Sequence, residues 1–135
     1  MTLEHVAIWT SNLERLKDFY INHFHGLAND KYTNHQKQFQ SYFIRFQSGA
    51  RLELMTRPDI PENANDPAGA QYLGIIHLAF SVDTMKEVDD LVSQFQKEGF
   101  PVLSGPRKTG DGYYEFETLD PDNNRIEVTT PYVES

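Results

Sequence analysis

The sequence predicts an α+β protein made of two tandem βαβββ modules. Two pairs of similar segments support this prediction. Residues 3–27 and 75–100 each open with an apolar stretch that carries a His two residues after its start, and each continues into an amphipathic helix followed by Gly. The hexapeptides RLELMT at 51–56 and RIEVTT at 125–130 form the second pair. Such self-similarity within one chain indicates a duplicated structural unit.

We place the modules at residues 1–58 and 74–132 of a single domain. The segment between them, residues 59–73, is polar and contains prolines, which is typical of a linker. A chain of 135 residues that is 39% hydrophobic is long enough to bury a core of its own.

The first module is expected to start with a strand at residues 3–10. Both faces of this strand are largely apolar, so we expect it to be buried on both sides. The capping-box pattern Ser11-x-x-Glu14 predicts the start of the following helix, and Gly26 is the expected C-cap. A hairpin is then expected from strands at 39–46 and 51–55.

The second module is expected to repeat this order. Residues 75–82 are predicted to form its first strand. A second capping box, Thr84-x-x-Glu87, opens the next helix, and Gly99 ends it. The remaining strands are expected at 102–103, 113–118 and 125–130.

The composition excludes several classes of protein. The chain has no cysteine, so it has no disulfide, thiolate nucleophile or sulfur-ligated metal site. Twelve basic and twenty acidic residues give a net charge of −8, which argues against nucleic acid or an anionic membrane as a partner. No apolar run approaches the roughly 18 residues of a membrane span, and the start lacks a signal-sequence pattern. We therefore expect a soluble, cytoplasmic protein.

One His and one Glu in each module are the candidate site residues: His5 with Glu53, and His77 with Glu127. Side chains alternate along a strand, so each Glu lies opposite its apolar neighbours. The neighbours that helices would cover are Leu52, Leu54, Ile126 and Val128. The His and Glu side chains would then project from the concave face of a curved mixed sheet, and a pseudo-two-fold would bring them into one cleft.

Two imidazoles and two carboxylates form a donor set suited to a divalent ion such as Ni²⁺, Co²⁺, Zn²⁺ or Mn²⁺. The alternative for each residue alone is structural, because a His in a buried strand is often a core residue and a Glu often faces solvent. Both types recur at matching positions, with His–Glu separations of 48 and 50 residues. This recurrence favours a metal site.

Two further motifs lie near the ends of the chain. The opening LEHVAI precedes a helix with Asp18-Phe19-Tyr20, and the chain closes on LDPDNNRIEV. With the four candidate ligands, these motifs resemble the vicinal oxygen chelate superfamily (the glyoxalase/bleomycin resistance protein/dioxygenase family), and most of all its glyoxalase I branch. The resemblance runs from Leu3 to about Pro131. Asn123 stands where that family usually has Gly, and because Asn tolerates positive φ we expect the turn to persist.

This resemblance implies a fold, a reaction and roles for the site residues. The fold is that of glyoxalase and dihydroxybiphenyl dioxygenase, and the assembly is a homodimer. The reaction is isomerisation of a thiol adduct of a 2-oxoaldehyde, or of a related 2-hydroxy carbonyl, through a metal-bound enediolate, as in lactoylglutathione lyase. Glu127 or Glu53 would move the proton. The alternatives are a non-catalytic, antibiotic-type binding module and a metal-dependent thiol transferase or dioxygenase.

Four residues are candidate contacts to the substrate. Trp9 and Arg57 stand where the glyoxalase I branch usually has an Arg and an Asn that help to hold glutathione, which favours a different thiol adduct or a 2-oxo acid derivative. Arg107 and Tyr113 belong to the glycine-containing segment 105–114, which would form a mobile flap that grips a carboxylate. The alternatives are ordinary packing for Trp9 and a solvated turn for the segment.

Overall fold

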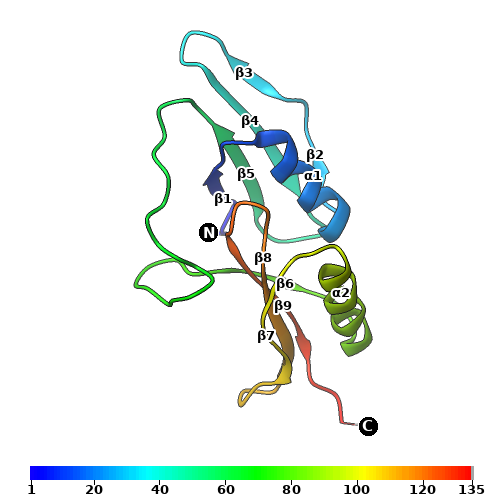
Figure 1. Ribbon diagram of the computed structural model, residues 1–135. Coiled ribbons are helices and arrows are strands. Elements are labelled where there is room, and N and C mark those ends of the chain that lie inside the picture. The colour runs from blue at the N-terminus through cyan, green and yellow to red at the C-terminus, as the bar shows by residue number, and fades with distance from the viewer. Residues whose placement is uncertain (135) are drawn as a thin grey trace. The chain divides into compact units, whose positions relative to one another are not determined.

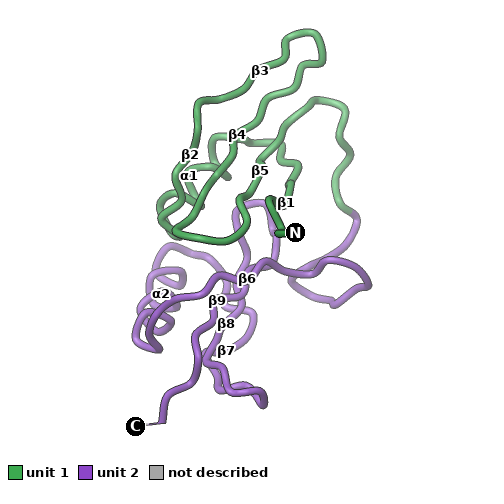
Figure 2. The backbone as a smooth tube through the Cα atoms, turned by 180° about the vertical axis from the view of Figure 1, so that it is seen from behind, with its two compact units in different colours: residues 1–63 green, residues 64–135 purple. Residues whose placement is uncertain are grey.

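The computed structural model describes residues 1–134 (Figure 1). The chain divides into two compact units. Unit 1 comprises residues 1–63 and unit 2 comprises residues 64–135 (Figure 2). Each unit holds one long helix and one mixed sheet. Within the described residues, none of the helices has the length and apolar character that crossing a membrane requires.

Unit 1 contains one helix and a mixed sheet. Its elements are β1 (His5–Trp9), α1 (Leu13–Phe24), β2 (Leu27–Ala28), β3 (Tyr32–Asn34), β4 (Phe39–Arg45) and β5 (Arg51–Thr56). The strand order is β1-β5-β4-β2, and β3 also pairs with β4. β1 runs parallel to β5, whereas the other pairs are antiparallel. The short strands β2 and β3 therefore both pair with β4, at different points along it, and together form one outer strand of the sheet.

Unit 2 repeats this topology with one uninterrupted outer strand. Its elements are β6 (Leu78–Ser81), α2 (Met85–Lys97), β7 (Val102–Lys108), β8 (Tyr113–Leu119) and β9 (Arg125–Pro131). The strand order is β6-β9-β8-β7, with β6 parallel to β9. The two predicted βαβββ modules are thus confirmed, and the duplicated hexapeptides occupy the equivalent strands β5 and β9.

In each unit the helix packs against the apolar side chains of the last strand. α1 contacts β4 and β5, and α2 contacts β7, β8 and β9. The residues predicted to lie under the helices are all buried: Leu52, Leu54, Ile126 and Val128. Because side chains alternate along a strand, Glu53 and Glu127 lie on the face that the helix does not cover.

The first strand of each unit differs from its prediction. In β1, His5, Ala7 and Trp9 are exposed and the residues between them are half-buried, so the expected burial on both sides is wrong. β1 ends the strand order of its sheet, and the face that carries His5, Ala7 and Trp9 is exposed. β6 begins only at Leu78, so His77 immediately precedes the strand instead of lying within it.

The helix starts differ from the prediction in α1 and agree with it in α2. Asn12, not Ser11, caps α1, because its side-chain oxygen accepts the Arg15 backbone N–H at 3.1 Å. Thr84 caps α2 as predicted, and its hydroxyl oxygen accepts the Glu87 backbone N–H at 3.1 Å.

Left-handed backbone conformations end both helices and form the last turn. His25 (φ 56°), not Gly26, takes the left-handed position after α1. Gly26 is instead required by space, because a Cβ there would collide with the buried side chain of Ile44. Gly99 (φ 88°) follows the end of α2, and Asn123 (φ 66°) adopts the positive φ expected of it.

Glu14 joins α1 to the rest of unit 1 through charged and polar contacts. Its carboxylate accepts from Lys31 Nζ at 2.7 Å, from Lys17 Nζ at 3.0 Å and from the Tyr42 hydroxyl at 2.9 Å. Hydrogen bonds from Lys31 and then from Lys17 lower the pKa of Glu14 from 4.5 to about 2.

Replacing Glu14 by Gln is expected to lower the free energy of unfolding at neutral pH by about 1 kcal/mol or less, because the carboxylate is half exposed and the pairs are screened. A carboxyl with a lowered pKa in the folded state stabilises above its unfolded pKa and loses this contribution as the pH falls through the folded value. The difference from wild type should therefore shrink between pH 4.5 and about 2. Urea unfolding at stepped pH measures it, with Glu62→Gln as an exposed control that should show a much smaller change.

Candidate metal centre

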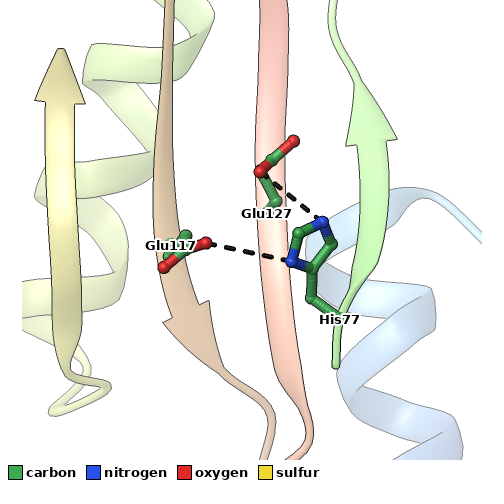
Figure 3. Close-up of side chains that lie close together, drawn as sticks. All are labelled: His77, Glu117 and Glu127. Carbon is green, nitrogen blue, oxygen red and sulfur yellow. Dashed lines mark ion pairs between the residues drawn. The ribbon is translucent and has the colours of Figure 1, made fainter. Parts of the chain in front are cut away.

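Three candidate metal ligands lie together in unit 2. His77 immediately precedes β6, Glu117 lies on β8 and Glu127 lies on β9 (Figure 3). Nε2 of His77 is 3.6 Å from Oε2 of Glu127, and Nδ1 of His77 is 3.9 Å from Oε1 of Glu117. One ligand atom from each residue lies within 4.8 Å of the others. Zn²⁺ binds N and O atoms at roughly 2.1 Å, so the three side chains would have to close around an ion to ligate it together.

The pairing of β8 with β9 brings the two carboxylates together. Glu117 lies directly opposite Glu127 in the antiparallel register, and Glu115 lies opposite Thr129. Side chains alternate along β8, so Glu115 and Glu117 share the face of Glu127, while Phe116 points into the core beneath α2. Three carboxylates therefore lie on one face of two neighbouring strands.

The surroundings of Glu127 disfavour its charged form. Burial raises the pKa of the Glu127 carboxyl, and the nearby carboxylate of Glu115 raises it further. His77 acts in the opposite direction, but the net direction is upward. A cation bound beside Glu127 would offset this repulsion, and its charge would favour the ionised carboxylate.

Arg125 is the buried cation beside this cluster. It is 6% exposed, and its Nη1 donates to Oε2 of Glu117 at 3.1 Å. Its Nε donates to the Pro67 carbonyl at 3.0 Å, and its Nη2 donates to the same oxygen. Arg125 thus holds Oε2 of Glu117, while Oε1 of Glu117 faces His77.

Unit 1 holds the second predicted pair. Nε2 of His5 lies 3.7 Å from Oε1 of Glu53, a separation close to that of His77 and Glu127. The residue opposite Glu53 in the register is Phe43, whose ring lies edge-on to the His5 ring with centroids 5.4 Å apart. Unit 1 therefore lacks the carboxylate that Glu117 supplies in unit 2 at this register position.

The structure brings together each of the two predicted His–Glu pairs. It adds Glu117, which the sequence analysis did not identify as a candidate. A signal for it was present, because Glu115 and Glu117 alternate with apolar residues in YYEFETL. That alternation did not show which of the two lies opposite Glu127, since this depends on the register of β8 against β9.

Two of the predicted substrate residues, Trp9 and Arg57, lie against each other. The Arg57 guanidinium lies 5.3 Å from the centre of the Trp9 ring, and its Nε donates to Asp59 at 2.6 Å. Trp9 also makes an edge-on contact with Phe39. Arg57 is thus already paired with a carboxylate, and it would have to exchange this partner to bind an anionic ligand.

Arg107 and Tyr113 lie in a β-hairpin and do not belong to a separate flap. β7 extends to Lys108 and pairs with β8, so the expected flap in segment 105–114 is reduced to the turn between the strands. Nη2 of Arg107 lies 3.8 Å from Oε1 of Glu115. Cross-strand pairing continues through most of this segment, and the unpaired part is a turn, which agrees with the alternative interpretation.

The residues present fit a divalent metal ion. Imidazole nitrogen and carboxylate oxygen are donors that Zn²⁺, Ni²⁺, Co²⁺ and Mn²⁺ all accept. The arrangement in unit 2 also supplies excess negative charge on a half-buried face, where His77 faces two carboxylates. These residues form a candidate His/Glu/Glu site for a divalent ion.

A model of the glyoxalase/bleomycin resistance protein/dioxygenase superfamily matches residues 2–128. The chain belongs to this superfamily. A relative of similar length is the uncharacterized protein YwkD of Bacillus subtilis, which is 26% identical over 130 residues, with 94% of each chain covered. Superfamily membership agrees with the paired βαβββ modules and with the duplicated His–Glu pairs.

Solved structures of this superfamily share the fold. The trypanothione-dependent glyoxalase I of Leishmania major aligns with a TM-score of 0.72 and 21% identity, covering 95% of this chain and 85% of that one. The fosfomycin resistance protein FosX of Listeria monocytogenes, solved with Mn(II) and sulfate, aligns with a TM-score of 0.68 and 16% identity over 97% and 93% of the chains. Both likenesses show the fold, which different reactions share.

Proposed function

We propose that this protein is a metal-dependent enzyme of the glyoxalase type, which isomerises the thiol adduct of a 2-oxoaldehyde or a related 2-hydroxy carbonyl. The observation that carries the proposal is the pair of His–Glu contacts at equivalent positions, with separations of 3.7 and 3.6 Å. His5, Glu53, His77 and Glu127 would be the ligands of its divalent ion. Membership of the superfamily supports a metal-dependent protein, since a glyoxalase I and a FosX solved with Mn(II) share this fold.

The ion would act as a Lewis acid toward the oxygen atoms of the substrate. The reaction itself moves one proton between adjacent carbon atoms and needs no oxidant or reductant. Glu127 accepts the proton from the carbon that bears the thiol and returns it to the neighbouring carbon. The hydroxyl proton of the first carbon passes to the oxygen of the neighbouring carbon, so the first carbon becomes the thioester carbonyl and the second carries the hydroxyl. An ionised carboxylate can accept a proton, and Glu127 lies next to His77 on the face that the helix does not cover, which suits this role. Glu53 is the equivalent candidate in unit 1.

The substrate contacts in this proposal come from unit 1 and from the hairpin of unit 2. Trp9 presents a partly exposed aromatic face, and Arg57 lies above it as a cation for an anionic group. Arg107 and Tyr113 are the corresponding candidates on β7 and β8. These residues do not repeat the contacts expected for glutathione, so the thiol partner is proposed to be a different one.

The deciding experiment combines metal analysis with a substrate panel. We expect about one divalent ion for each set of two His–Glu pairs after loading with Ni²⁺, Co²⁺, Zn²⁺ or Mn²⁺. We also expect turnover of at least one hemithioacetal in a panel of thiols and 2-oxoaldehydes. A loaded protein that isomerises none of the panel contradicts the enzyme proposal. Protein that takes up no metal but binds a small apolar ligand supports the binding-module alternative, and oxygen uptake supports a dioxygenase.

We further propose a homodimer. Within each sheet the end strands have one partner, and large apolar side chains such as Leu73 and Ile75 are exposed. A dimer would have a mass of 2 × 15.6 = 31.2 kDa. Light scattering at micromolar concentration is expected to give this value, and a measured mass of 15.6 kDa would refute the dimer.

A further inference from the structure

The His77 ring in unit 2 lies between two carboxylates that contact different nitrogen atoms. Nε2 faces Glu127 at 3.6 Å, whereas Nδ1 faces Glu117 at 3.9 Å (Figure 3). The second oxygen of Glu117 accepts from Arg125 at 3.1 Å. Arg125 is itself buried and held by the Pro67 carbonyl. A series of contacts therefore runs from the Pro67 carbonyl through Arg125 and Glu117 to Nδ1 of His77.

The His5 ring in unit 1 is held in the same manner by other residues. Nε2 faces Glu53 at 3.7 Å, and Nδ1 lies 3.3 Å from Oε1 of Glu4. The second oxygen of Glu4 accepts from Nε of Arg51 at 2.9 Å, and Oε1 also accepts from Nη2 of the same guanidinium. Arg51 in turn stacks on Phe43, with its guanidinium 4.1 Å from the ring centre. Again an arginine holds a carboxylate against Nδ1 of the histidine.

The two arginines are equivalent, but the two carboxylates are not. Arg51 and Arg125 each stand two residues before the Glu of their pair, at the start of β5 and of β9. Glu117 comes from β8, where the equivalent residue of unit 1 is Phe43. A phenylalanine cannot accept a hydrogen bond, and Glu4, adjacent to His5 in the chain, supplies the acceptor instead. In both units a carboxylate thus lies against Nδ1 of the histidine, but it comes from a different position in each unit.

We propose that Glu117 and Glu4 are positioning residues, each of which accepts a hydrogen bond from the Nδ1–H of its histidine and so leaves Nε2 free to bind a metal ion. A neutral imidazole carries one N–H, and the partner of one nitrogen determines whether the other has a free lone pair. In both units the free nitrogen would be the one that faces the Glu of the pair. The metal part of this inference rests on the proposed function, whereas the tautomer does not.

Glu117 in this role holds the His77 ring and is not a third metal ligand. A carboxylate that accepts the second N–H of a ligating histidine orients the ring and strengthens it as a donor. The 3.9 Å separation exceeds a normal hydrogen bond, so the side chains must close by about 1 Å. Such contacts are often long in the ligand-free protein and tighten on binding. Glu117 is held by one oxygen to Arg125, which leaves Oε1 for this single task.

The first test measures the tautomers of both histidines in the full-length, metal-free protein. Long-range ¹H–¹⁵N correlation spectra distinguish Nδ1–H from Nε2–H, and the variants His5→Gln and His77→Gln assign the two signals. We expect the proton on Nδ1 in both residues. Glu117→Ala should move His77 toward the Nε2–H form and leave His5 unchanged, and Glu4→Ala should do the reverse. An Nε2–H signal for His77 in the wild type, or no change in Glu117→Ala, overturns the proposal.

The second test measures Zn²⁺ affinity by competition with a chelator. Glu117→Ala is expected to weaken binding by about 10- to 100-fold, the usual effect of losing such a partner. Glu117→Gln keeps the size of the side chain and an oxygen that can accept from Nδ1–H, so its loss should be smaller. A loss in Glu117→Gln as large as that in His77→Ala would make Glu117 a ligand and overturn the positioning role. If the wild type binds no Zn²⁺, the proposed function fails, while the tautomers still decide the inference.

Discussion

Replacing His77 by alanine is expected to weaken metal binding by about 100-fold or more, because it removes one of the two nitrogen donors of the proposed centre. The imidazole is the group that lies between Glu117 and Glu127, so its loss also leaves these carboxylates facing each other without a donor between them. Isothermal titration of Zn²⁺ or Ni²⁺ into the metal-free protein measures the change. His77 is half-buried outside the apolar core, so the variant should still fold.

A matched control for this prediction is His35→Ala. His35 is exposed in the turn between β3 and β4 and lies outside both His–Glu pairs. We expect this variant to bind metal as the wild type does. His5→Ala should lose affinity as strongly as His77→Ala if both pairs bind one ion. Full affinity in His5→Ala would show that unit 2 binds the metal alone, through His77 and its two carboxylates.

Replacing Glu127 by glutamine is expected to reduce turnover by about 1,000-fold while most of the metal stays bound, because an amide cannot take the proton that the reaction moves. The substitution preserves the size of the side chain and one oxygen that can still contact the ion. It also removes the carboxylate whose charged form is disfavoured by burial and by Glu115. The measurement pairs metal content with the initial rate on the best adduct of the panel.

Glu62→Gln serves as the control for general effects of removing a carboxylate, because Glu62 is exposed in the segment between the modules. Its rate and metal content should match those of the wild type. Unchanged turnover in Glu127→Gln would exclude Glu127 as the base. Glu53→Gln would then be the next variant, since Glu53 holds the equivalent position against His5.

Local patterns predicted most of what the two units share. The repeat of RLELMT as RIEVTT identified equivalent strands, and alternation along them placed Leu52 and Ile126 in the core. The same alternation placed Glu53 and Glu127 on the opposite face, each near its histidine. These inferences succeeded because strand periodicity is a property of the backbone and can be read from neighbouring residues.

The errors concern features that local patterns leave open. Ser11 and Asn12 can both cap a helix, and only the backbone path showed that Asn12 accepts the Arg15 N–H. The apolar strand β1 was expected to be buried on both faces, but the face that carries His5, Ala7 and Trp9 is exposed. The segment 105–114 was interpreted as a flap, whereas in the structure its two ends pair as parts of β7 and β8.

The sequence by itself determined the duplicated topology, the helix-covered core and the two His–Glu pairs, because each of these follows from spacing along the chain. Only the tertiary structure decided which carboxylate lies at the second nitrogen of each histidine. Glu117 lies opposite Glu127 through the register of two strands, whereas Glu4 lies beside His5 in the chain itself. Arg125 joins Glu117 to Pro67, which stands 58 residues away in the sequence. Such contacts depend on how strands align across a sheet, and no local periodicity specifies that alignment.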